Sequence, residues 1–249
     1  MKSGQPSMIR TRPHAAAFYL TLALFAISLS GTQADESLKT YSYSNFRVLY
    51  GDGLAIAYDL NSGKAKQIYR DFNTFKPDPE PGEGGVTQSY TLLSLVGPIV
   101  SYTTDWYGEG GAHPSYGTSY STYDLRTGKP ASLLDYYSAD TLLQVFLKDT
   151  VLKKAVREPA KIKSLNQFFE EVEGGCEMYI DKDMLEHFAF HHVKGNNVAI
   201  RIGLSHGCEA MRGNFTEIGI YLPVPKALKD AMDRSVKLGH LMSNLTKGK

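Results

Sequence analysis

Short runs in which apolar and polar residues alternate, each closed by turn residues, constrain the fold of this 249-residue chain more than any other feature of its sequence. The first group spans Phe46 to Tyr69 and is interrupted by Gly51-Asp52-Gly53 and by Asn61-Ser62-Gly63-Lys64. Alternation with a period of two places the apolar side chains on one face of a strand, and turns of this composition join antiparallel neighbours. The pattern therefore predicts a meander of short antiparallel strands.

Further strands are expected from Tyr90 to Tyr107 and from Tyr116 to Leu125. The turn from Tyr123 to Lys129 repeats the spacing of Tyr58 to Lys64, with an aspartate and a glycine at matching positions. The aspartate can hydrogen-bond the backbone of its own turn, and the glycine can adopt the positive φ that closes a hairpin. We interpret the repeat as one turn used twice, because a repeat architecture needs at least about three similar units.

Helical signals are confined to the second half of the chain. Apolar residues recur at helical spacing from Leu142 to Val156, after Ser138 and Asp140, either of which can cap a helix. Ser164 followed by Gln167 has the form of a capping box. A hairpin over residues 186–204, a strand over 215–222 and a closing helix over 225–242 complete the pattern. We therefore expect an α+β fold, with an antiparallel sheet, helices packed on one side of it, and an N-terminal strand-rich subdomain.

The first 34 residues have the three parts of a cleavable signal peptide. A basic leader precedes an apolar run from Ala15 to Leu29, and Thr32 and Ala34 are the small residues that a signal peptidase reads. The alternative is a permanent membrane anchor, but a spanning helix needs about 20 apolar residues and this run is shorter. We expect cleavage after Ala34, a periplasmic or secreted protein, and no transmembrane segment after cleavage.

Three parts of the chain follow from these signals. Residues 1–34 are the signal peptide, residues 35–86 an N-terminal strand-rich subdomain, and residues 87–249 the main α+β domain. The boundary after residue 86 is placed there because Lys76 to Gly85 is rich in proline and glycine, which disfavour regular structure.

Charge and cysteine content narrow the range of functions. Cleavage removes Lys2, Arg10 and Arg12 and no acidic residue, which moves the formal net charge from +1 to −2. That balance argues against a nucleic-acid partner, because nucleic-acid-binding proteins normally carry a basic face. Cys176 and Cys208 are the only cysteines. In an oxidising compartment they predict one disulfide closing a loop of about 33 residues, whereas a redox or metal pair would favour CxxC spacing.

A glycine-rich segment from Asp105 to Pro114 carries the chemistry most suited to a ligand. Glycines let a ligand approach the backbone, and loops held by a rigid sheet often bind ligands. The predicted ligand-binding residues are Trp106, Tyr107, Glu109, His113 and Tyr116. Two alternatives stay open: an acid–base pair built from Glu109 and His113, and a purely structural connection between strands.

His187, His191 and His192 lie close together in the sequence, and on a helix His187 and His191 would share a face and could hold zinc. The alternating phenylalanines and the following turn favour a strand, on which His187 and His191 face one way and His192 the other. Two histidines on one face are a weak metal signal without a third ligand. We therefore expect no metal and no cofactor. The sequence also carries no nucleophile elbow, phosphate-binding loop, zinc-protease or dinucleotide motif, which lowers the weight of the common enzyme classes.

Several of these segments resemble one family. They are Gly110-Gly111-Ala112-His113-Pro114, then Tyr123-Asp124 with Thr127-Gly128-Lys129, then Leu133-Leu134-Asp135, and finally the strand from Ile218 to Pro223 before the last helix. Together they resemble the RsiV-like family of bacterial extracytoplasmic domains of unknown function, over roughly Thr87 to Ala231.

The resemblance implies a cell-envelope setting. Such domains form the outer part of membrane-bound anti-sigma factors, where they can bind lysozyme, and they also accompany peptidoglycan deacetylase domains. This chain shows no probable transmembrane helix with a cytoplasmic anti-sigma segment, and no attached catalytic domain, so neither activity is carried over. The expected function is an exported binding module for a lysozyme-like protein or a peptidoglycan-related partner. The alternatives are an envelope hydrolase using Asp105, Glu109 and His113, with or without a metal, and a mainly structural protein.

Overall fold

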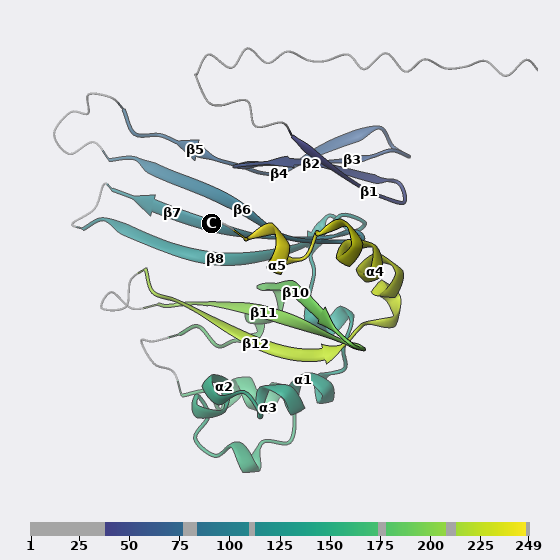
Figure 1. The fold of residues 1–249 in the computed structure, drawn as a ribbon. Coiled ribbons are helices and arrows are strands. Elements are labelled where there is room, and N and C mark those ends of the chain that lie inside the picture. The colour runs from purple at the N-terminus through teal and green to yellow at the C-terminus, as the bar shows by residue number, and fades with distance from the viewer. Residues whose placement is uncertain (1–37, 77–83, 110–112, 174–177, 208–212, 248–249) are drawn as a thin grey trace, which may run out of the picture. The chain divides into compact units, whose positions relative to one another are not determined.

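The computed structural model of the protein describes residues 38–76, 84–109, 113–173, 178–207 and 213–247. Within these residues the alternating segments form three antiparallel sheets, and short helices pack against them (Figure 1). The α+β class and the N-terminal group of strands expected from the sequence are confirmed. The predicted signal peptide and both cysteines, Cys176 and Cys208, lie outside the described residues.

The first group of alternating residues forms the N-terminal sheet, in which each strand pairs with the next along the chain. Its strands are β1 (Lys39–Tyr43), β2 (Phe46–Gly51), β3 (Leu54–Asp59) and β4 (Lys64–Arg70). Inward-facing Tyr41, Val48 and Tyr69 are buried in one apolar cluster with Leu92 and Val100 of the following sheet. This cluster attaches the N-terminal strands to the rest of the protein.

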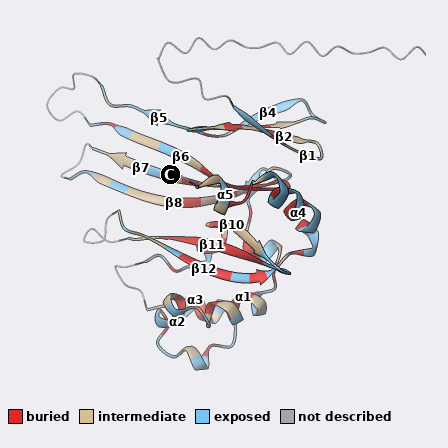
Figure 2. Ribbon diagram, viewed as in Figure 1, coloured by how far each residue is buried: buried red, intermediate tan, exposed pale blue. Residues whose placement is uncertain are grey.

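The central sheet carries the longest strands and pairs them in chain order. Its strands are β5 (Phe72–Asn73), β6 (Val86–Val96), β7 (Ile99–Gly108), β8 (Ser115–Asp124) and β9 (Lys129–Pro130). One edge of β8 pairs with β7 along its length, and the other edge pairs with β9 only at Tyr123 and Asp124. The rest of this second edge has no strand partner among the described residues. The ends of β7 and β8 near Gly108 and Ser115 are the more exposed ones (Figure 2).

The C-terminal sheet contains the predicted hairpin and the strand expected after it. Its strands are β10 (Phe188–Lys194), β11 (Asn197–Ser205) and β12 (Phe215–Pro223), paired in that order. On β11, Ile200, Ile202 and Leu204 alternate into the largest apolar core of the protein. The opposite face of this sheet packs toward the central sheet, where Ala189 and Tyr120 share a smaller cluster.

Short helices cover the outer face of the C-terminal sheet and one end of the sheets (Figure 1). In chain order the helical elements are η1 (Leu133–Asp135), α1 (Ala139–Phe146), α2 (Thr150–Lys154), η2 (Pro159–Lys161), α3 (Leu165–Glu170), η3 (Lys182–Glu186), η5 (Lys226–Leu228), α4 (Lys229–Leu238) and α5 (Met242–Leu245).

The helical pattern predicted from Leu142 to Val156 is divided between two helices. Ser138 caps α1 by accepting a hydrogen bond from Thr141, and Asp149 caps α2 by accepting from Val151 and Leu152. Ser164 caps α3 as expected. The Gln167 side chain, however, accepts from the backbone N–H of Lys163 rather than from that of Ser164, so the capping box is incomplete.

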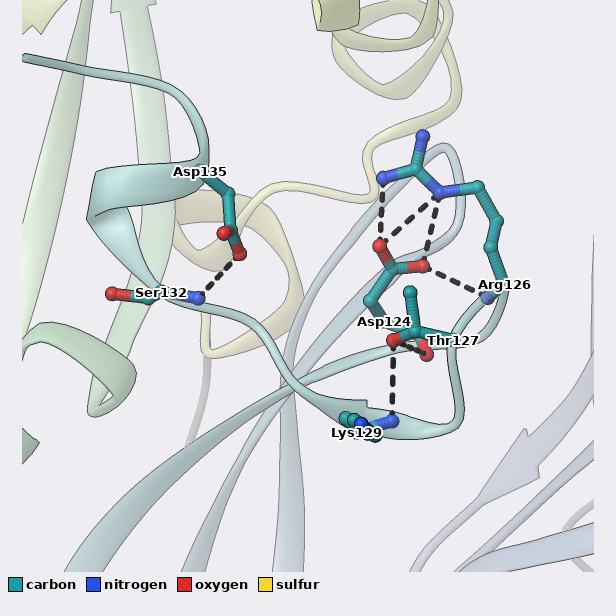
Figure 3. Close-up of polar contacts among 6 residues, drawn as sticks. All are labelled: Asp124, Arg126, Thr127, Lys129, Ser132 and Asp135. Carbon is teal, nitrogen blue, oxygen red and sulfur yellow. Dashed lines mark hydrogen bonds and ion pairs between the residues drawn. The ribbon is translucent and has the colours of Figure 1, made fainter.

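The repeated turn is built as its sequence predicts, and Figure 3 shows the second copy. Asp124 accepts from the backbone N–H of Arg126 at 2.8 Å, and its carboxylate pairs with the Arg126 guanidinium at 2.6 Å. Gly128, with φ 70°, donates its N–H to the Asp124 carbonyl. The same roles are filled by Asp59 and by Gly63, with φ 67°.

The third segment of the family resemblance is also explained by local structure. Asp135 accepts from the backbone N–H of Ser132 at 2.8 Å (Figure 3). The Ser132 hydroxyl in turn accepts from the backbone N–H of Leu134. This reciprocal pair caps η1 and satisfies backbone donors that have no partner inside the helix. Asp124 and Asp135 are therefore accounted for by a turn and a helix cap.

The alternation predicted for the histidines is wrong, because β10 contains a bulge between Phe190 and His192. An extra residue in a strand shifts the side chains that follow it. As a result, Nδ1 of His191 and Nδ1 of His192 lie 2.7 Å apart instead of on opposite faces. His187 precedes β10 and ends the helix η3.

Candidate functional site

Strands β7 and β8 place two aromatic side chains at their exposed end. In the register of the central sheet, Trp106 is opposite Gly117 and Tyr107 is opposite Tyr116. A Cβ atom on Gly117 would lie 2.8 Å from Nε1 of Trp106, closer than real Cβ atoms approach. The indole can therefore lie across β8 only because residue 117 has no side chain. This position brings Trp106 to the edge of β8 that has no strand partner among the described residues.

Tyr116 and Tyr179 also rest on glycines. The ring of Tyr116 lies against Gly213, which has φ 79°, and the ring of Tyr179 lies against Gly207. In both cases a Cβ atom would overlap the ring. Each ring thus packs against the backbone of a glycine, while about half of the residue's surface stays exposed to solvent.

These aromatic residues surround one pocket with a volume of about 560 Å³. It lies at the unpaired edge of β8, beside the end of β11 and the start of β12. The exposed fractions of Trp106, Tyr116 and Tyr179 are 37%, 48% and 58%. The described residues lining the pocket are Trp106, His113, Ser115, Tyr116, Gly117, Thr118, Ser119, Tyr179, Ser205, His206, Gly207, Gly213 and Asn214.

Polar contacts hold the wall that the C-terminal sheet contributes. The Ser205 hydroxyl donates to the Thr118 carbonyl at 2.8 Å and so connects β11 to β8. Nε2 of His206 lies 2.8 Å from the Thr216 hydroxyl. Nδ1 of His206 is buried and has no hydrogen-bond partner among the described residues. Buried polar atoms without a partner are rare in folded proteins and call for an explanation.

The structure brings Trp106, His113 and Tyr116 together, as lining residues of this pocket, and leaves Tyr107 and Glu109 outside its lining. The Tyr107 hydroxyl donates to the Glu109 carboxylate instead, and this hydrogen bond raises the pKa of Tyr107 above its ordinary value. Sequence reasoning missed Tyr179, Ser205 and His206. They are far from Trp106 along the chain, and only the packing of the two sheets brings them near it.

The two acidic residues of the hydrolase alternative are not among the described residues that line the pocket with His113. Asp105 accepts from the Thr118 hydroxyl at 2.6 Å, and Glu109 accepts from Tyr107. Neither carboxylate belongs to the described lining of the pocket. A general acid and base have to reach the same substrate atoms, so among the described lining residues neither Asp105 nor Glu109 forms such a pair with His113.

A smaller hollow of about 250 Å³ adjoins the first and shares Tyr179 and Ser205 with it. Asp181, Asp183 and His187 complete its lining. Asp181 has a structural role, because its carboxylate accepts from the backbone N–H of Asp183 and caps η3. Tyr179 therefore lies between a pocket whose described lining holds no Asp, Glu, Lys or Arg and a hollow lined by two carboxylates.

The histidine pair on β10 lies away from the pocket. His192 Nε2 is 3.0 Å from the Tyr221 hydroxyl. Burial, followed by the charge of Arg201, lowers the pKa of His191 below its ordinary value. Among the residues that the structure describes, no three His, Cys, Asp or Glu side chains are grouped to hold a metal ion.

Comparison with known proteins adds no relative: no protein-family model matches the chain, and no curated protein matches it at a significant level. The resemblance to the RsiV-like family therefore stays a prediction from its motifs. Within the described part of the chain, the helices are too short or too polar to span a bilayer.

Proposed function

We propose that the protein is an exported cell-envelope binding module that recognises its partner at the pocket lined by Trp106, Tyr116 and His113. The observation that carries the proposal is the gathering of glycine-backed, exposed aromatic rings around one pocket. Aromatic side chains supply much of the binding energy at recognition sites, and rings already held in place lose little conformational freedom on binding.

Burial elsewhere in the protein supports a binding role for these rings. Most of the aromatic side chains in the described strands are buried or half-buried, so exposure at the pocket is not general to the sheet. Exposed apolar groups that cluster around a concavity are a feature of interaction sites, whereas single exposed ones are ordinary.

The envelope setting rests on two sequence features. The leader ending at Ala34 directs export. The resemblance to RsiV-like domains implies a lysozyme-like protein or a peptidoglycan fragment as partner. The hydrolase alternative receives no support, because the structure does not gather Asp105 and Glu109 with His113 at the pocket.

The proposal is tested by retention of the protein on envelope material. The full chain is expressed with its own leader in a bacterial host, and the exported protein is purified. One arm measures co-sedimentation with peptidoglycan sacculi, and the other measures capture on immobilised lysozyme. We expect binding in at least one arm, lost in W106A and weakened in H113A.

Y221A is the matched control, because Tyr221 is also an exposed strand tyrosine (50%) but does not line the pocket. It should bind like the parent protein, and melting curves should show that W106A remains folded. Absence of binding in both arms would remove the proposal. Release of soluble muropeptides by the parent protein would replace it with the hydrolase alternative.

A further inference from the structure

The described part of the pocket lining is aromatic and uncharged. Its described residues supply indole and phenol rings, hydroxyls, imidazoles, an amide and glycines, and include no Asp, Glu, Lys or Arg. A charged ligand would lose its hydration there without gaining an opposite charge from the described lining residues. The lining therefore selects a ligand that is neutral where it is bound and that offers both apolar faces and many hydroxyl or amide groups.

We infer that this pocket binds an oligosaccharide through sugar rings that carry no charge. The inference rests on the proposed function, since it names the ligand class of the same site. A pyranose ring presents C–H groups on its faces and hydroxyls at its rim. The face of an aromatic ring is electron-rich and attracts such polarised C–H groups, and stacking also removes apolar area from water.

The positions of the aromatic residues suit a chain of sugars better than a single ring. Trp106 reaches the pocket from β7 across Gly117, Tyr116 lies on β8 against Gly213, and Tyr179 enters from the segment before η3. The pocket volume of about 560 Å³ falls in the range of about 300–1,000 Å³ typical of ligand sites. Successive sugar rings can then contact rings that come from different parts of the chain.

Hydrogen-bonding groups beside the rings match the rim of a sugar. Ser115, Ser119 and Asn214 contribute neutral side chains to the lining. The Nδ1 atom of His206 is buried beside the pocket without a partner among the described residues. A ligand hydroxyl that satisfied this nitrogen would recover a hydrogen bond that the free protein lacks.

An extended peptide is the main competing occupant, because the edge of β8 has no strand partner over residues 115–122 among the described residues. A peptide that adds to a sheet pairs with the outward carbonyl and N–H groups of the edge. The Thr118 carbonyl on this edge already accepts from the Ser205 hydroxyl, and β11 packs against β8 there. The edge is thus obstructed where a pairing strand would have to bind.

The experiment uses the fact that Trp106 is the only tryptophan in the chain and lines the pocket. The exported protein is titrated with a soluble tetramer of N-acetylglucosamine while tryptophan emission is recorded. A parallel titration uses the stem peptide of peptidoglycan without sugar. We expect saturable quenching or a blue shift with the saccharide and no change with the peptide.

Variants then assign the signal to the other rings. Y116A and Y179A should each weaken saccharide binding about tenfold or more, because each removes a stacking surface. Y179F keeps the ring and should bind nearly as well as the parent protein. Y221A removes a comparably exposed tyrosine outside the pocket and should leave the titration unchanged.

Failure of this inference is distinguishable from failure of the proposed function. If sacculi or lysozyme retain the protein through Trp106 but the saccharide leaves the emission unmoved, the ligand is not a sugar chain and the binding role stands. A response to the stem peptide instead would assign the pocket to peptide recognition. Absence of retention in both envelope arms, together with a silent titration, would overturn both.

Discussion

At the scale of single residues, glycines decide where the aromatic side chains of the pocket can lie. Gly117 sits under the indole of Trp106, and Gly213 sits under the ring of Tyr116. A strand interior normally disfavours glycine, because it adds backbone entropy and packs no side chain. Here the missing side chain permits a close approach that no other residue type would allow.

Substitution of Gly117 by alanine should displace the indole. The new Cβ would lie 2.8 Å from Nε1 of Trp106, so the ring has to move away from the edge of β8. We expect a shift in tryptophan emission and loss of sacculus or saccharide binding. G108A is the control in the same sheet, because a Cβ there would meet its nearest neighbour at an ordinary 3.6 Å. Unchanged emission in G117A would contradict this account of the pocket.

A buried histidine should make stability depend on pH. His240 is buried, its Nε2 lies 3.1 Å from the Tyr50 hydroxyl, and its ring packs edge-on against Tyr41 at 4.9 Å. Burial, followed by the charge of Arg234, lowers its pKa below the usual 6.5. The unfolded chain therefore binds the proton at a higher pH than the folded protein does.

Above pH 6.5 the imidazole is neutral in both states and its contribution to stability is complete. As the pH falls from 6.5 toward the lowered pKa of the folded protein, that contribution is lost. Denaturant titrations at about pH 8 and about pH 5 should show this loss, and H240Q should reduce it. An equal loss in H240Q would assign the effect to other groups, of which His191 is the first to examine.

At the scale of elements, the two copies of the repeated turn have the same construction but different burial. In each copy an aspartate accepts from the backbone two residues later and a glycine closes the turn with positive φ. Asp124 is 5% exposed and holds the guanidinium of Arg126, whereas Asp59 is half-buried and its carboxylate accepts from the uncharged side chains of Asn45 and Ser62. The sequence repeat therefore predicts the turns, and tertiary packing makes them unequal.

Alanine at the two aspartates should show this inequality. D124A leaves a buried end of β8 without its turn-closing acceptor and leaves Arg126 unpaired, so we expect the free energy of unfolding to fall by about 2 kcal/mol. D59A removes the same turn contacts at a half-buried position that holds no guanidinium, and should cost clearly less. Chemical denaturation of both variants measures the difference. Equal losses would mean that burial of Asp124 adds nothing to the turn.

At the scale of the whole molecule, the pocket is formed by segments that the chain brings together from two sheets. The central sheet contributes Trp106 and Tyr116, and the C-terminal half contributes Tyr179 and His206. The backbone N–H of Tyr179 donates to the Ser205 carbonyl at 2.9 Å, which fixes the position of this wall. Cys176 and Cys208 lie outside the described residues, but Tyr179 and Gly207, near them in sequence, are in contact.

The predicted disulfide should therefore stabilise both the protein and the pocket. Thiol titration of the denatured exported protein should find no free thiol before reduction. Reduction, or C176S combined with C208S, should lower the free energy of unfolding by about 3 kcal/mol and weaken ligand binding, because Tyr179 and Gly207 would lose their covalent tether. Reactive thiols in the unreduced protein, with no effect of reductant on melting, would rule the disulfide out.

Most of the features that the sequence predicted correctly depend on patterns within a few residues. The strands from Phe46 onward, the hairpin of β10 and β11, the caps Ser138 and Ser164 and the repeated turn all depend on residues close together in the chain. Two predictions of periodicity failed or were incomplete because one inserted residue or one local break changes the pattern. The bulge at His191 and the division of the 142–156 segment into α1 and α2 are of this kind.

By itself the sequence determined the α+β class, the turn positions and the place of Trp106, His113 and Tyr116 on one exposed loop and its strands. These depend on side-chain periodicity, backbone restrictions and local hydrogen bonds, which act over a few residues. Only the tertiary structure decided that Tyr107 and Glu109 pair with each other, and that Tyr179, Ser205 and His206 complete the pocket. The reason is physical: sheet-on-sheet packing brings together residues with no local relation, and the fit of a ring against a distant glycine depends on that packing alone.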